Sequence, residues 1–133
     1  MLRKFLHAKI HRAAVTRCDP DYVGSITIDA ELLAATGLRP NEAVTVCDID
    51  NAARFETYII RGHPGSGAIE VNGAAAKLVE TGHKLIILGY GLMESHEDTL
   101  NAHASRVVVC DADNRIERSL EYSSTIDEPD LVA

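Results

Sequence analysis

Short apolar runs, separated by turn residues, dominate this chain. Each run has the length of a strand, and the longest one, residues 85–92, is interrupted by Gly89 and Gly91. Runs of this length with turn residues between them are typical of β-strands rather than of long helices. The expected strands cover residues 2–16, 26–28, 43–49, 54–60, 68–71, 84–92 and 107–110.

Two short helices are expected between these strands. Asp29 can cap a helix over residues 30–36, which Gly37 ends. Asn72 stands at the start of a second helix, expected over residues 74–80. Many short strands with two small helices predict a mainly β fold with short helices, of the β-barrel kind.

Length and composition indicate one domain and argue against several functions. With 133 residues, of which 46% are hydrophobic and 25% charged, the chain can form one ordinary hydrophobic core. The net charge of −7 argues against a nucleic-acid partner. No run reaches the roughly 20 apolar residues that span a membrane, so we expect no membrane contact. We expect the domain to cover residues 1–118 and residues 119–133 to form a flexible acidic tail.

The cysteines, histidines and glycines suggest neither a metal site nor a phosphate site. Three cysteines, without metal-type spacing, fit reduced thiols in a cytoplasmic protein. His7 and His11 would form a metal-binding pair on a helix, but no third ligand stands near them in sequence. The glycine-rich residues 62–67 lack the lysine and hydroxyl pair of a phosphate-binding loop, so we interpret them as a hairpin loop.

The candidate chemistry centres on Gly24 and Ser25, at the turn before strand 26–28. Taken alone, a Gly-Ser pair at a turn needs no function, because both residues are common turn formers. Here, however, residues that could serve a reactive serine recur at three other places in the chain. They are Lys9 with His11, residues 54–58, and residues 72–75.

These motifs, in this order and at these spacings, resemble the pyruvoyl-dependent aspartate 1-decarboxylases over residues 2–92. The resemblance implies a six-stranded double-psi β-barrel that assembles into a homotetramer with sites between subunits. It also implies that the chain cuts itself between Gly24 and Ser25, and that the product formed from L-aspartate is β-alanine, a precursor of pantothenate and coenzyme A. A maturation factor is a further partner that the family allows.

The resemblance assigns a role to each matching residue. Ser25 would become the pyruvoyl group that forms a Schiff base with the substrate, and no metal or pyridoxal phosphate would be needed. Tyr58 would donate a proton, and Thr57 would assist the cleavage at Gly24. Substrate binding would fall to Lys9, Arg54, Thr57, Asn72, Gly73, Ala74 and Ala75, with His11 and Tyr22 in support.

The strand pattern raises one difficulty for these roles. In an extended strand, Arg54, Glu56 and Tyr58 share one face. Thr57 then lies on the opposite face, so its role requires either a bulge or contact with a different subunit.

Four positions depart from the family pattern, and other functions stay open. Val23, Cys47, Ala52 and His83 stand where glutamate, a larger residue, glycine and aspartate are common.

A pyruvoyl decarboxylase of another acidic amino acid, such as glutamate, is one alternative function. A non-catalytic β-barrel binding or regulatory module is another, and it would leave the chain intact. A pyridoxal-phosphate enzyme is excluded because the chain is short and no lysine has a phosphate-binding loop beside it.

Overall fold

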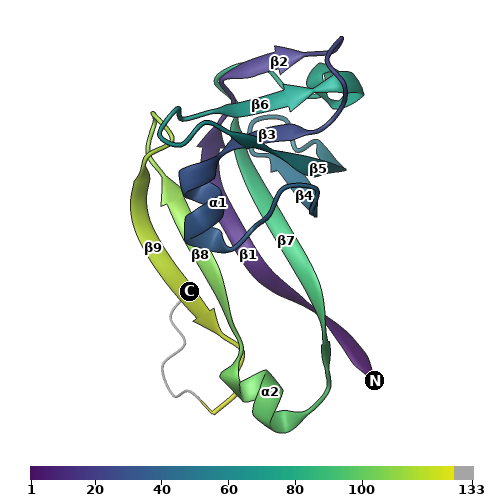
Figure 1. Ribbon diagram of the computed structural model, residues 1–133, viewed down its shortest axis with the longest axis vertical. Coiled ribbons are helices and arrows are strands. Elements are labelled where there is room, and N and C mark those ends of the chain that lie inside the picture. Colours follow the sequence, from purple (N-terminus) through teal and green to yellow (C-terminus); the bar gives the residue numbers. More distant parts are fainter. Residues whose placement is uncertain (128–133) are drawn as a thin grey trace.

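The computed structural model describes residues 1–127 of the chain. Within them, nine strands and three short helices follow one another (Figure 1). They are β1 (Leu2–Ala14), β2 (Arg17–Asp19), β3 (Ile26–Asp29), α1 (Ala30–Thr36), β4 (Ala43–Asp48), β5 (Arg54–Gly62), β6 (Ile69–Asn72), η1 (Gly73–Lys77), β7 (Lys84–Glu94), α2 (Glu97–Ala102), β8 (Ala104–Cys110) and β9 (Ile116–Ser123).

All nine strands join one sheet, in the order β2-β6-β3-β5-β4-β7-β1-β8-β9. Most neighbours are antiparallel, but β1 with β8, β2 with β6, and β3 with β5 are parallel. Figure 1 shows β1 and β7 as the two long central strands, with the shorter strands β2 to β6 gathered at one end. The expectation of a mainly β fold with short helices is confirmed.

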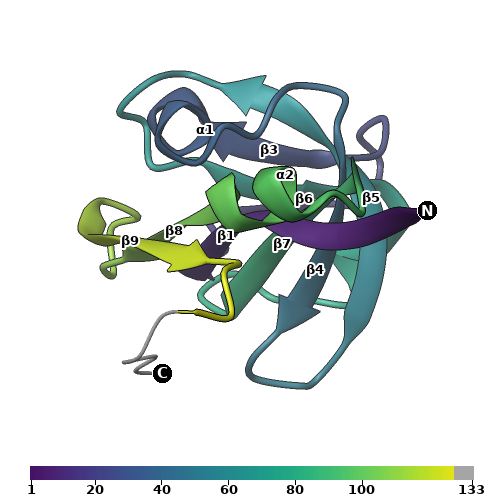
Figure 2. The ribbon, with the colours of Figure 1, turned by 90° about the horizontal axis from the view of Figure 1, so that it is seen from below.

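The core lies on the concave side of this curved sheet. Ile10, Ile26, Ile59 and Ile87, from four different strands, are all 0% exposed and belong to one apolar cluster. Figure 2 shows the curvature of the sheet, with α1 beside β3. Burial of this cluster is the main stabilising contribution to the fold.

Helix α1 has the bounds that its sequence signals predict. Asp29 Oδ1 accepts a hydrogen bond of 2.8 Å from the Glu31 backbone amide. Gly37 ends the helix in the left-handed conformation, with a φ of 81°. Asp29 also accepts hydrogen bonds from the backbone amides of Gly65 and Gly67, so the cap joins α1 to the loop before β6.

Several expected bounds were wrong. The helix expected over residues 74–80 is a shorter 3₁₀ helix, η1, which begins at Gly73 with a φ of 73° and ends at Lys77. Three elements were missed: β2, α2 and β9. Strands β5, β7 and β8 also extend beyond the expected limits, and β1 ends at Ala14 rather than at residue 16.

The expected boundary between domain and tail also needs correction. Residues 119–123 belong to β9, which pairs with β8 along its length. Most β9 side chains are exposed, so this strand lacks the apolar pattern that identified the others. Residues 128–133, the end of the expected tail, lie outside the described residues. Within residues 1–127, no helix has the length and apolar composition needed to cross a membrane.

Candidate active site

Ser25 occupies an unusual backbone position at the entry to β3. It is 2% exposed, and its φ of 97° lies in the left-handed region. This conformation is unfavourable for any residue with a side chain and costs about 1–3 kcal/mol. Strand β3 follows at once and holds Ile26 between β5 and β6. The peptide bond between Gly24 and Ser25 is therefore held next to a strained residue by rigid neighbours.

The Asn72 side chain lies against the Ser25 hydroxyl. Asn72 Nδ2 donates to Ser25 Oγ at 3.3 Å and to Thr27 Oγ1 at 3.2 Å. The Asn72 backbone amide also donates to the Ser25 carbonyl at 2.9 Å. Asn72 occupies the N-cap position of η1, as its sequence context predicts, but its side chain makes no capping hydrogen bond. Its amide is instead directed at Ser25 and Thr27.

Gly73 packs directly against the Gly24 backbone. A Cβ atom at Gly73 would lie 2.8 Å from Gly24 Cα and 3.5 Å from the Tyr22 carbonyl oxygen. The Gly73 φ of 73° also favours glycine. The contact leaves no room for a side chain at this position, and the backbone conformation disfavours one.

Tyr58 approaches the same peptide bond from β5. A methyl group on Gly24 would lie 3.8 Å from the Tyr58 hydroxyl oxygen. The Tyr58 side chain is 39% exposed, so its hydroxyl can reach both the Gly24 region and solvent. The structure thus brings together Gly24, Ser25, Tyr58, Asn72 and Gly73, all of which the sequence singled out.

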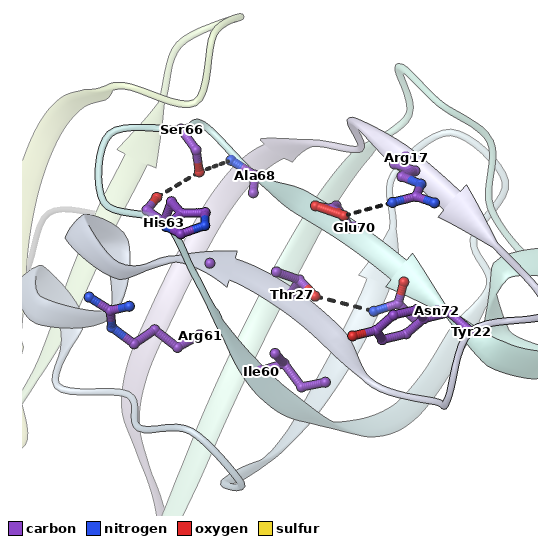
Figure 3. A pocket seen from close by; sticks show the side chains of 11 residues that line it. Arg17, Tyr22, Thr27, Ile60, Arg61, His63, Ser66, Ala68, Glu70 and Asn72 are labelled. Atoms are coloured by element: carbon purple, nitrogen blue, oxygen red, sulfur yellow. Dashed lines mark hydrogen bonds and ion pairs between the residues drawn. The ribbon is translucent and has the colours of Figure 1, made fainter.

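A pocket of about 300 Å³ opens beside this group. Tyr22, Thr27 and Asn72 line one end of it, and His63 and Ser66 line the other (Figure 3). Thr27 was not among the residues that the sequence singled out. The alternation of side chains along β3 could have found it, because residues 25 and 27 point to the same side of a strand.

Further candidate residues lie on the outward face of the sheet. Directly paired residues in neighbouring strands share a face, and the pairs here run from Arg54 through Cys47 and Ile86 to His11. Lys9, two residues before His11, is on this same face. The β5 and β1 strands are three strand spacings apart, so the backbones of Lys9 and Arg54 in one chain are at least about 14 Å apart.

Thr57 lies on β5 alongside the segment that precedes β3, because Ile26 pairs with Ile59 in the parallel register. Strands β4 and β5 pair without a register shift, so no bulge turns Thr57 toward the face of Tyr58. Ala74 and Ala75 follow Gly73 in η1, where Ala74 is exposed and Ala75 packs against the core.

His11 has an unusual environment. Its Nδ1 atom is buried and has no hydrogen-bond partner among residues 1–127. Burial and the positive charges of Lys9, Arg12 and Arg118 lower the pKa of His11. The lowered pKa favours the neutral form of the imidazole.

A second polar cluster lies away from Ser25, where β4 ends and β7 begins. His83 Nδ1 lies 2.6 Å from Asp48 Oδ2, and Asp50 Oδ2 accepts a hydrogen bond from the Lys84 backbone amide. One ligand atom from each of Asp48, Asp50 and His83 falls within 4.8 Å of the others. The hydrogen bond that His83 donates to Asp48 raises the pKa of His83, and the charges of Asp48, Asp50 and Glu80 act in the same direction, against the effect of burial. These contacts fasten two loops together.

Comparison with known proteins gives a consistent result. A family model described as aspartate decarboxylase matches residues 1–117. A protein named aspartate 1-decarboxylase from Listeria welshimeri serovar 6b is 47% identical over 125 residues, which cover 94% of this chain and 97% of that protein. With the geometry around Ser25, these matches show that the chain belongs to the aspartate decarboxylase family.

Proposed function

We propose that this protein converts L-aspartate to β-alanine and carbon dioxide, using a pyruvoyl group that the chain makes from its own Ser25. The observation that carries the proposal is the state of Ser25: buried, at a φ of 97°, with its hydroxyl held by Asn72. A buried residue with a strained backbone and a fixed nucleophile is a typical feature of a reactive site.

The chain's own atoms suffice for the cleavage. Ser25 Oγ attacks the Gly24 carbonyl carbon, the C–N bond breaks, and the Oγ proton ends on the freed amine. Loss of the Ser25 Cα proton then expels the Gly24 carboxylate from Cβ and leaves dehydroalanine. Water replaces its nitrogen and releases ammonia, so that residue 25 ends as a ketone. The absence of a side chain on Gly24 leaves its carbonyl open to this attack.

The residues around position 25 fit a pyruvoyl group. Such a group presents oxygens, and the Asn72 backbone amide already donates to the Ser25 carbonyl oxygen, which the pyruvoyl group keeps. Gly73 packs so closely against Gly24 that no side chain fits between them. When formed, the pyruvoyl group supplies an electron-withdrawing carbonyl that takes up the electron pair left by departing carbon dioxide.

The other residues bind the substrate and move its proton. Arg54 has the planar, bidentate geometry that suits a carboxylate, and we assign it with Lys9 to the substrate's side-chain carboxylate. Strong pairing of the α-carboxylate would instead oppose its loss. We assign to the Tyr58 hydroxyl, which lies near Gly24, the donation of the proton that replaces the carboxylate.

We further propose that the complete site forms between subunits of a homotetramer. The backbones of Lys9 and Arg54 in one chain are about 14 Å apart, so both could reach one aspartate only with extended side chains directed toward each other. Thr57 likewise points away from the face of Tyr58 in its own chain. A second copy could supply either residue.

A cytoplasmic location fits the free thiols of Cys18, Cys47 and Cys110.

The test is product formation by the purified protein with two substrates. We expect β-alanine from L-aspartate, a rate at least tenfold lower with L-glutamate, and no product from Ser25→Ala. Faster turnover of glutamate would assign the second substrate instead. Equal behaviour of the wild-type and Ser25→Ala proteins, with neither making product, would support the non-catalytic module.

A further inference from the structure

We propose that Thr27 is a positioning residue for self-cleavage. Its hydroxyl accepts one N–H of the Asn72 amide and thereby aims the other N–H at Ser25 Oγ. The inference rests on the proposed self-cleavage and adds to it a residue that contacts neither the scissile bond nor the substrate.

The two hydrogen bonds share one planar group. Asn72 Nδ2 donates to Thr27 Oγ1 at 3.2 Å and to Ser25 Oγ at 3.3 Å. An amide nitrogen carries two hydrogens at fixed angles in one plane. When Thr27 accepts the first hydrogen, the direction of the second is therefore set.

Without Thr27, little else would set that direction. The terminal torsion of an asparagine side chain has broad energy minima, so hydrogen-bond partners decide how its amide is turned. Asn72 makes no capping hydrogen bond to η1, and Nδ2 has only the two hydroxyl partners among residues 1–127. Thr27 is in β3, whose pairing with β5 and β6 holds it rigidly (Figure 3).

The bond to Ser25 Oγ matters most when that oxygen becomes the leaving atom. After the acyl shift, Oγ bridges Ser25 Cβ and the Gly24 carbonyl carbon as an ester oxygen. In the elimination, the Cβ–Oγ bond breaks and its electron pair stays on Oγ, as part of the new Gly24 carboxylate. An N–H directed at Oγ stabilises this developing charge. Loss of the Thr27 hydroxyl should therefore slow the elimination more than the acyl shift.

The experiment follows cleavage of freshly purified intact chains by denaturing mass spectrometry, with and without hydroxylamine. Hydroxylamine cuts the ester and releases a fragment that begins with an ordinary serine. Completed cleavage gives, in the sample without hydroxylamine, a fragment lighter by one ammonia, and hydroxylamine converts the ketone of that fragment to an oxime. Thr27→Val removes the hydroxyl and keeps the shape, and Thr27→Ser keeps the hydroxyl. Thr45→Val is a matched control, because Thr45 is also half-buried in a strand and its hydroxyl has no hydrogen bond among residues 1–127.

We expect Thr27→Val to slow formation of the lighter fragment about tenfold and to raise the share of hydroxylamine-released fragment. Thr27→Ser and Thr45→Val should stay within about twofold of wild type. In an Asn72→Ala background, Thr27→Val should have no further effect, because the residue acts through Asn72.

Three results would overturn the inference while leaving the proposed function intact. They are wild-type rates in Thr27→Val, equal slowing in Thr27→Ser, and slowing without a rise in trapped ester. If the wild-type chain gives neither fragment, also after incubation with a cell extract that can supply a maturation factor, the proposed function itself fails, and this inference with it.

Discussion

At the scale of single residues, two neighbouring backbones constrain the same peptide bond. Ser25 has a φ of 97°, and Gly73, with a φ of 73°, packs against Gly24. The backbone conformation of Ser25 and the contact of Gly73 with Gly24 both restrict how the peptide bond between Gly24 and Ser25 can relax. We infer that the close approach of Gly73 helps to maintain the reactive geometry.

Gly73→Ala should therefore impair cleavage. Its Cβ would lie 2.8 Å from Gly24 Cα, so the Gly24 backbone must move. We expect cleavage, followed by denaturing mass spectrometry, to slow at least tenfold, because small misplacements of reacting atoms have effects of about this size or larger. Gly82→Ala is the control: its φ is 92°, but nothing lies within 4 Å of the added Cβ. Equal cleavage rates in the two variants would show that the contact with Gly24 is unimportant.

Ala52 offers a prediction about stability rather than chemistry. It has a φ of 64° in the turn between β4 and β5, a conformation that suits glycine better than alanine. Ala52→Gly should raise the free energy of unfolding by up to about 1 kcal/mol, since relief of strain outweighs the greater freedom of the unfolded chain. Urea denaturation at fixed protein concentration measures this. Ala53→Gly, next to it, should lower stability, and a similar loss in Ala52→Gly would contradict the account.

The sequence predicted part of this residue-scale picture. Gly24, Ser25, Tyr58, Asn72 and Gly73 were found from their motifs, and the fold brings them together. The role of Thr27 was not predicted, because it depends on the direction of the Asn72 amide in space. No residue pattern carries that information.

At the scale of elements, the contact between His83 and Asp48 makes stability depend on pH. It joins the end of β4 to the loop before β7. The hydrogen bond that His83 donates to Asp48 is the main reason that the pKa of His83 is raised. The stability it contributes is fully present below the unfolded pKa of about 6.5 and is lost as the pH rises through the higher folded pKa.

The comparison of wild type with His83→Gln tests the direction in which this stabilisation changes with pH. The advantage of the wild-type protein in free energy of unfolding should be largest near pH 6 and should shrink toward pH 9. Urea denaturation across that range measures the difference. An advantage that is constant or grows with pH would show that the histidine is not protonated in this contact.

The buried side chain of Asn114, in the turn between β8 and β9, joins the end of β1 to the loop before β6. Its Oδ1 accepts from the Ala14 amide at 2.7 Å, and its Nδ2 donates to the carbonyls of Ala14 and Gly67, each at 2.8 Å. Asn114→Asp removes both donated bonds and buries a charge, so it should lower the free energy of unfolding by about 3 kcal/mol. Asn101→Asp, on exposed α2, should change it by less than about 0.5 kcal/mol. Similar midpoints in urea for the two variants would contradict this role.

Elements were predictable where local signals were strong. Helix α1 has the predicted bounds because Asp29 and Gly37 mark both of its ends. Strand β9 was missed because its stability comes from backbone pairing with β8 rather than from an apolar face. The helix after Asn72 was overestimated because Gly73 adopts a positive φ that an α-helix does not allow.

At the scale of the whole molecule, one sheet serves two purposes. Its concave side holds the core, and its outward face carries Lys9, His11 and Arg54 on the central strands. Tyr58 and Gly24 meet where the chain enters β3 of the same sheet. Because Lys9 and Arg54 are far apart within one chain, we expect the outward face to be completed by a second copy.

The central claim is that the chain makes its own ketone at Ser25, and one measurement tests it directly. Protein that forms β-alanine from aspartate is analysed by mass spectrometry under denaturing conditions, before and after borohydride treatment. The account predicts two fragments, residues 1–24 and residues 25–133, the larger without a free amino end and heavier after reduction. Active protein that consists of a single intact chain, with no reducible group at Ser25, would contradict it.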